Sequence, residues 1–402
     1  MRRVVITGIG VLSSIGNTFD ELADSIRHGR SGVAPIASMD VTGLAGRLGC
    51  EVRGVDIPMH FPAGTSRRMD RSTQYAVIAA RQAAAMANWR PTDTEPRRTG
   101  VVIGTTIGGL LLGTRYYEYQ HRRGRHCAGM LSDYLLYSAG ARIVREFGLE
   151  GPNIAFSTAC SSSNVALGHA ADLVRHGRLD TAFVGGVDTM AKTTVAGFNA
   201  LRNVARETMR PFDKNRTGLV LGEGAAIFCI ETEDSARGRG ARVLAEILGY
   251  GMSTDAYHMT APDATGRGPA LAMTRALAQS GIERADVEYI NAHGTATRHN
   301  DEVETRAIKK VFGASAATIP VSSTKPMHGH MLGATGAIEA AAIIAAMRDG
   351  YFPPTINYRD ADPRCDLDYV PNEARLGRFT TALSNNFGFG GNNCALVLRS
   401  AF

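Results

Sequence analysis

A single cysteine stands where an apolar run changes into an Ala-rich one. The residues around it read Ile154-Ala-Phe-Ser157-Thr-Ala-Cys160-Ser-Ser-Ser-Asn164. This pattern predicts a strand that turns sharply into a helix. The dipole and the free N–H groups at a helix N-terminus favour a thiolate, and such a turn exposes a side chain for attack. Cys160 is therefore a candidate nucleophile, and a small buried cysteine is the alternative interpretation of this segment.

Two further segments that follow predicted strands contain histidines. They read Asn291-Ala-His293-Gly-Thr295-Ala-Thr297 and Ser323-Thr-Lys325-Pro-Met-His328-Gly-His330. A histidine at a strand end, followed by glycine, points into a cleft, although a structural histidine is the alternative. Zinc binding by His293, His328 and His330 is a rival interpretation. No carboxylate or cysteine at a fixed local spacing completes that set, so we predict no metal site.

Glycine-rich segments lie near both ends of the chain. The C-terminal one reads Ser384-Asn-Asn-Phe387-Gly-Phe389-Gly-Gly391-Asn-Asn393. Its glycines let the backbone approach a ligand and offer an N–H to an oxyanion, unless the segment is simply a hairpin. The N-terminal one reads Gly8-Ile-Gly10-Val-Leu-Ser-Ser-Ile-Gly16. It is only a weak dinucleotide-binding signal, because the third glycine is misplaced and no acidic ribose binder follows.

The elements that must position these segments alternate between short β-branched runs and Ala-rich helices. This alternation predicts α/β layers. The predicted helix 333–348 is apolar nearly all round, so we expect it to be buried on all sides, like the helix after Cys160. Two buried helices between sheets predict a body of five layers. A further helix is expected over 133–147.

Bulk properties narrow the class of protein. The 402 residues carry a net charge of +6, concentrated in local Arg clusters, with no nucleic-acid-binding signature. We therefore expect an acidic protein partner. Six cysteines without paired spacing favour a reduced, cytoplasmic setting. The chain opens on a strand-like run, so no signal peptide is expected, and no apolar stretch is long enough for membrane insertion.

Taken together, these segments resemble the β-ketoacyl-(acyl-carrier-protein) synthases of the thiolase superfamily, in particular the discrete elongating type of bacterial type II fatty acid and polyketide systems. The similarity covers essentially the whole chain and includes Arg210-Pro-Phe-Asp213, Gly222-Glu-Gly224 and Tyr257-His-Met-Thr260. It implies a duplicated thiolase-like α/β fold with five α-β-α-β-α layers. Residues 1–240 would form the half with the nucleophile, and residues 241–402 the half with the catalytic histidines.

The resemblance also implies a decarboxylative Claisen condensation. Cys160 would hold the acyl chain, and the N–H groups of Cys160 and Phe389 would stabilise the oxyanion. His293 and His330 would hold the thioester oxygen of malonyl-acyl-carrier protein while CO2 leaves. The products are a β-ketoacyl-carrier protein and CO2. No cofactor is expected, because the substrates arrive on the phosphopantetheine arm of the acyl carrier protein.

Other residues receive supporting roles from the same resemblance. Lys325 and Glu304 match a charged pair, and Phe389 also matches a gate between the acyl and malonyl pockets. The residues that would hold the phosphopantetheine arm are Thr260, Thr295 and Thr297. The walls of the acyl tunnel would be Ile107 and Tyr134. The arginines that would dock the carrier protein are Arg67, Arg68, Arg202 and Arg206. The partner subunit would be a second copy or a chain-length-factor-like chain.

Several positions depart from the family pattern and suggest a specialised polyketide or polyene branch. They are Ser161–Ser163, Thr217, Arg298–Asn300, His328, Asn386 and Asn392. Two rival functions use the same fold. A non-catalytic chain-length factor lacks the nucleophilic cysteine. A thiolase carries a second cysteine in the Gly-rich loop, whereas Cys394 lies just beyond that loop here.

Overall fold

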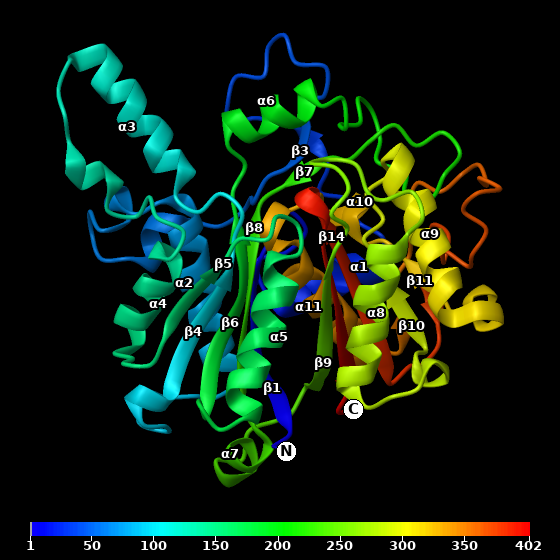
Figure 1. Ribbon diagram of the computed structural model, residues 1–402. Coiled ribbons are helices and arrows are strands. Elements are labelled where there is room, and N and C mark those ends of the chain that lie inside the picture. Colours follow the sequence, from blue (N-terminus) through cyan, green and yellow to red (C-terminus); the bar gives the residue numbers. More distant parts are fainter. Residues whose placement is uncertain (1) are drawn as a thin grey trace.

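A computed structural model describes residues 2–402, and a ten-stranded sheet organises it (Figure 1). One half of the sheet contains, from its edge inward, β5 (Asn153–Phe156), β4 (Thr99–Gly104), β6 (Thr181–Asp188), β8 (Gly224–Thr232) and β1 (Val4–Leu12). The other half continues with β9 (Ala245–Thr254), β15 (Asn392–Ser400), β14 (Thr381–Gly388), β10 (Tyr289–Asn291) and β11 (Val321–Ser322).

The two halves repeat one topology. In sequence order, the strands are β1, β4, β5, β6 and β8 in the first half, and β9, β10, β11, β14 and β15 in the second. In each half the first strand pairs antiparallel with the fifth, and the fifth pairs antiparallel with the fourth. The fourth, second and third strands then lie side by side in that order and run parallel. Within the ten-stranded sheet, the halves are joined by the pairs Val5 with Glu246 and Ile6 with Ala245, between β1 and β9. The fold is therefore duplicated, as predicted.

Helices complete five layers (Figure 1). On one outer face α2 (Arg71–Met86) and α4 (Ser138–Phe147) cover the first half of the sheet. On the other, α8 (Arg267–Ser280) covers the second half and packs against α9 (Arg298–Phe312). The central layer contains α5 (Ser162–Arg175) and α11 (Thr335–Asp349), which contact strands of both halves, and α1 (Phe19–Arg27).

The predicted all-round burial of the last long helix is confirmed. Every residue of α11 from Thr335 to Met347 is buried. The helix has apolar side chains on every face because it lies between the two halves of the sheet. Both α5 and α11 begin at the same end of the molecule, so the segments that precede them, with Cys160 and His330, come together there (Figure 1).

The N-terminal glycines are not a dinucleotide loop. Gly8 and Gly10 lie inside β1, and a Cβ at these positions would stand 1.9 Å from the carbonyl oxygen of Ala83 and 1.8 Å from that of Ala79. Helix α2 therefore packs its backbone directly onto the strand. Close packing, rather than phosphate binding, explains these glycines.

The helix expected over 133–147 begins only at Ser138. Tyr134 directs its carbonyl to the N–H of Gly109 (3.2 Å), so that oxygen is committed outside the helix. The carboxylate of Asp133 accepts from Arg142 (2.8 Å). Tyr134 and Tyr137 consequently lie in a turn, 41% and 51% exposed. The expected helix is therefore wrong at residues 133–137.

Two of the longer helices were not predicted, α3 (Leu110–Arg123) and α6 (Lys192–Ala200), and α3 projects from the body as an arm (Figure 1). The short elements are β2 (Ala34–Pro35), β3 (Leu48–Cys50), β7 (Leu221–Gly222), β12 (Tyr351–Phe352), β13 (Arg375–Leu376), α7 (Glu233–Gly238) and α10 (Lys325–His328). The predicted boundary after residue 240 falls between α7 and β9 and stays a prediction. Within residues 2–402 no helix is both long and apolar enough to cross a membrane.

Candidate active site

The nucleophile candidate lies on the turn between β5 and α5. Ala159, directly before Cys160, has φ +53°, a left-handed conformation that is rare for a residue with a Cβ. The strained turn brings Cys160 to the wall of a pocket of about 300 Å³, where its side chain is nearly enclosed at 6% exposure. The predicted strand–turn–helix around Cys160 is confirmed.

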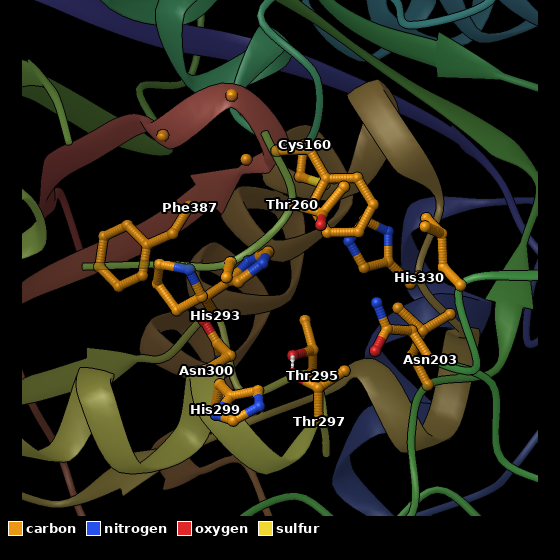
Figure 2. A pocket seen from close by; sticks show the side chains of 18 of the residues that line it. Cys160, Asn203, Thr260, His293, Thr295, Thr297, His299, Asn300, His330 and Phe387 are labelled. Atoms are coloured by element: carbon orange, nitrogen blue, oxygen red, sulfur yellow. Dashed lines mark hydrogen bonds between the residues drawn. The ribbon is translucent and has the colours of Figure 1, made fainter. Parts of the chain in front are cut away.

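Three predicted residues meet at this pocket. The sulfur of Cys160 and one ring nitrogen each of His293 and His330 all lie within 4.8 Å of one another. The two imidazole rings are 5.6 Å apart and nearly perpendicular. Figure 2 shows the three side chains pointing toward a common space. His293 follows β10 and His330 follows α10, both in the second half, whereas Cys160 lies in the first half, so both halves build the cluster.

The hydrogen bonds of His330 determine where its proton lies. Burial, followed by the positive charge of Lys325, lowers the pKa of His330 to about 3, so the ring is neutral at neutral pH. Its Nδ1 accepts the N–H of Leu332 (3.0 Å) and faces the Thr335 hydroxyl at 3.3 Å. A neutral ring that accepts at Nδ1 carries its proton on Nε2. His330 therefore presents an Nε2–H donor.

His293 is held from behind by a carboxylate. Glu304 accepts the backbone N–H of His293 and that of Gly294, both at 2.8 Å. Burial raises the pKa of Glu304 to about 7, against the lowering effect of these two hydrogen bonds. Burial, then Lys325 and His330, lower the pKa of His293 well below its usual value, so this imidazole is neutral as well.

The charged pair expected between Lys325 and Glu304 needs correction. Lys325 Nζ instead forms a direct ion pair with Glu339 (2.6 Å), and both side chains are fully buried. The second carboxylate oxygen of Glu339 accepts from Asn386 Nδ2 (2.7 Å). Glu339 is the acidic residue in the otherwise apolar first three turns of α11. A buried charge needs a partner, so this lone acidic residue in an apolar helix was a signal in the sequence that Glu339 is paired.

The thiol of Cys160 does not behave as its helix position suggested. Burial raises its pKa to about 11, although Lys325 and hydrogen bonds from the backbones of Phe389 and Cys160 lower it. Desolvation thus outweighs the helix N-terminus. The same contacts place the Gly-rich loop beside the nucleophile. A Cβ at Gly388 would lie 3.1 Å from the Cys160 nitrogen.

The zinc site considered for His293, His328 and His330 is wrong. Both ring nitrogens of His328 have other partners, because Nδ1–H donates to the carbonyl of Gly329 (2.8 Å) and Nε2 accepts from the Thr324 hydroxyl (3.0 Å). His330 is itself poorly suited to a metal. A ligating imidazole normally donates its second nitrogen's N–H, whereas Nδ1 of His330 faces the N–H donor of Leu332.

The pocket wall brings the predicted arm-binding residues together. Thr260, Thr295 and Thr297 line it, and the hydroxyls of Thr295 and Thr297 are 2.9 Å apart (Figure 2). Phe389 also lines the pocket and stacks on Phe198, with ring centroids 5.5 Å apart. Sequence reasoning gave no site role to further lining residues, among them Asn203, His299 and Asn300.

Comparison with known proteins decides the family. Residues 1–236 match the family described as "Beta-ketoacyl synthase, N-terminal domain", and residues 244–359 match "Beta-ketoacyl synthase, C-terminal domain". The chain belongs to the β-ketoacyl synthase family. This synthase is 41% identical over 411 residues to "3-oxoacyl-[acyl-carrier-protein] synthase 2" of Coxiella burnetii (strain RSA 493 / Nine Mile phase I), with 100% of this chain and 99% of that protein covered.

Solved structures agree with this assignment. "The ishigamide ketosynthase/chain length factor" has a TM-score of 0.94 and 37% identity, with both chains covered completely. "AntDE:AntF (apo): type II PKS acyl-carrier protein in complex with its ketosynthase bound to the hexaketide" has a TM-score of 0.92 and 32% identity, also over 100% of both chains. The expected fold and activity are thereby confirmed. The synthase is an acyltransferase of chain elongation.

Other sequence expectations lie outside the pocket. Ile107 packs on the cluster that includes Leu332, and neither Ile107 nor Tyr134 lines the pocket beside Cys160, so the tunnel wall stays a prediction. The docking arginines are exposed. Arg67 and Arg68 lie on one short 3-10 turn, and Arg202 and Arg206 line a separate hollow of about 650 Å³. Cys394, considered for a thiolase, is buried inside β15 and does not line the pocket.

Proposed function

We propose that the synthase uses Cys160, His293 and His330 to extend an acyl chain by decarboxylative condensation with malonyl-acyl-carrier protein. The observation that supports this proposal is the cluster itself. One thiol and two neutral imidazoles have their reactive atoms within 4.8 Å in one pocket. This is the set that thioester exchange and enolate stabilisation require.

Chain loading comes first. The sulfur of Cys160 attacks the carbonyl carbon of an acyl thioester, and the thiol of the phosphopantetheine arm leaves with the proton that Cys160 gives up. The raised pKa of Cys160 means that the thiol loses its proton during attack rather than before it. The backbones of Cys160 and Phe389 lie beside the sulfur, and their N–H groups supply the oxyanion hole.

Condensation follows on the acylated enzyme. The malonyl thioester oxygen accepts from Nε2–H of His330 and from His293. The bond to the carboxylate breaks, CO2 leaves, and the electron pair moves onto the held oxygen as an enolate. The enolate carbon then attacks the acyl-Cys160 carbonyl, which yields the β-ketoacyl-carrier protein and frees Cys160. Lys325 adds a fixed positive charge nearby, and Glu304 positions the backbone of His293.

Substrates reach this site on a carrier arm, so we propose that no bound cofactor is needed. Thr260, Thr295 and Thr297 hold the arm, and Phe389 gates the passage from the malonyl side to the acyl side. The exposed arginines at 67, 68, 202 and 206 steer an acidic acyl carrier protein. We place the reaction in the cytoplasm, in keeping with cysteines that are all free in the described chain.

Mass spectrometry of peptides tests the proposal. The protein is incubated with acyl-carrier protein, then digested, and the acylated residue is located. We expect one acyl group on Cys160 and, after malonyl-carrier protein is added, a β-ketoacyl product with release of CO2. Cys160→Ala should abolish both. An acyl group on any other cysteine overturns the assignment.

A partner subunit is the second part of the proposal. Strand β5 ends the sheet with all four residues only half buried, and the neighbouring Tyr134–Tyr137 turn leaves four large apolar side chains exposed. An open sheet edge beside an apolar patch favours a subunit interface. The partner is either a second copy or a chain length factor, the kind of protein named together with the ishigamide ketosynthase. Native mass spectrometry of the chain expressed alone distinguishes the two.

A further inference from the structure

Asp188, the last residue of β6, is a fully buried carboxylate that the proposed mechanism does not use. Its Oδ1 accepts the hydroxyl of Thr105 (2.7 Å) and the N–H of Ile107 (3.0 Å). Its Oδ2 accepts the N–H groups of Thr106 (2.8 Å) and Gly333 (2.6 Å). No salt bridge reaches Asp188 from any residue between 2 and 402. Four donors alone hold this charge.

The four donors come from two segments that the active site depends on. Thr105–Ile107 follow β4 and include the predicted wall of the acyl tunnel. Gly333 directly follows Leu332, whose N–H orients His330. The packing is close, since a Cβ at Gly333 would lie 2.8 Å from Asp188 Oδ2 and 2.7 Å from the Thr106 nitrogen.

A third connection reaches the nucleophile turn. The hydroxyl of Thr106 donates to the carbonyl of Ala159 (3.3 Å), the residue in left-handed conformation directly before Cys160. The carboxylate is thus bonded to the tunnel wall and to the end of the His330 turn, and it is one residue removed from the Cys160 turn. These three segments come from different parts of the chain.

We propose that Asp188 is a positioning residue whose carboxylate holds the Ile107 wall and the His330 turn in register with Cys160. A carboxylate suits this role because it only accepts hydrogen bonds, so both oxygens receive donors from both segments. An asparagine would present an NH2 group to one pair of donors and break that pair. The proposal rests on the role of Cys160 proposed above, and it concerns the geometry of that site.

The test compares Asp188→Asn with Thr105→Val. Both remove hydrogen bonds to the wall, but only Asp188→Asn removes the negative charge, which raises the pKa of Cys160. The first readout is the pH dependence of Cys160 alkylation by iodoacetamide. It needs no substrate and no turnover, so it is independent of the proposed function. We expect the midpoint to move to lower pH in Asp188→Asn and to stay in place in Thr105→Val.

The second readout is kcat/KM for a series of acyl primers of increasing length. We expect Asp188→Asn to lose about 10²-fold with the preferred primer, since a displacement of about 1 Å costs that much, and to lose less with the others. Thr105→Val should also lower kcat/KM for the preferred primer relative to the other primers, but by a smaller factor. An unchanged primer preference in Thr105→Val overturns the proposal even if Asp188→Asn fails to fold. An unchanged primer preference in folded Asp188→Asn overturns it as well.

Discussion

The two histidines on either side of Gly329 provide a matched pair of substitutions. His330 faces Cys160, whereas both nitrogens of His328 are bonded to Thr324 and Gly329. His330→Ala removes a donor from the enolate oxygen. Loss of one such donor costs about 10²- to 10³-fold in rate, or about 2.7–4 kcal/mol. His328→Ala removes hydrogen bonds that act only within its own turn, so we expect it to lower thermal stability more than it lowers catalysis.

The assay separates the two half-reactions. Acyl loading of Cys160 is followed by intact mass, and decarboxylation by CO2 release from malonyl-carrier protein. We expect His330→Ala to keep most of the loading and to lose decarboxylation. We also expect the wild-type decarboxylation rate to show no histidine titration between about pH 5 and 8. The pKa of His330 is lowered to about 3 and that of His293 is lowered too, so both rings are already neutral throughout this range.

Two results would refute this reasoning. Equal loss of decarboxylation in His328→Ala and His330→Ala would mean that His328 also contacts substrate. A rate that rises with an apparent pKa near 6.5 would mean that an imidazole must lose a proton before it acts. Measured with the same carrier protein, the pH dependence separates a donor role for His330 from a proton-transfer role.

Three further predictions concern the pocket's surroundings. Lys325→Met leaves Glu339 charged and without its ion-pair partner, so we expect a stability loss of about 3–5 kcal/mol. Adding Glu339→Gln to this variant should restore the melting temperature but not the decarboxylation rate. Recovery of both would assign Lys325 a purely structural role. Charge reversal at Arg67 and Arg68 should raise KM for carrier-bound substrate and not for a pantetheine mimic, and an unchanged salt dependence would contradict steering. Ile107→Ala should lengthen the accepted primers and Ile107→Trp should shorten them, as product mass profiles will show; identical profiles would place the tunnel elsewhere.

Local patterns in the sequence determined much of this protein. The change from an apolar to an Ala-rich run predicted the turn at Cys160, and the all-round apolar character of 333–348 predicted a central buried helix. Glycine directly follows His293 and stands between His328 and His330, which marked the turns where His293 and His330 emerge. These inferences succeeded because periodicity and turn chemistry act over a few neighbouring residues.

Only the tertiary structure decided the electrostatics of the site. Lys325 pairs with Glu339 rather than Glu304, and the thiol of Cys160 has a raised rather than lowered pKa. The four hydrogen bonds of Asp188 likewise join segments about 80 and 145 residues away. A pKa depends on how completely water is excluded and on which charges lie nearby, and both follow from packing between the two halves of the fold. Motif spacing identified the reacting groups, whereas burial between layers set their protonation states.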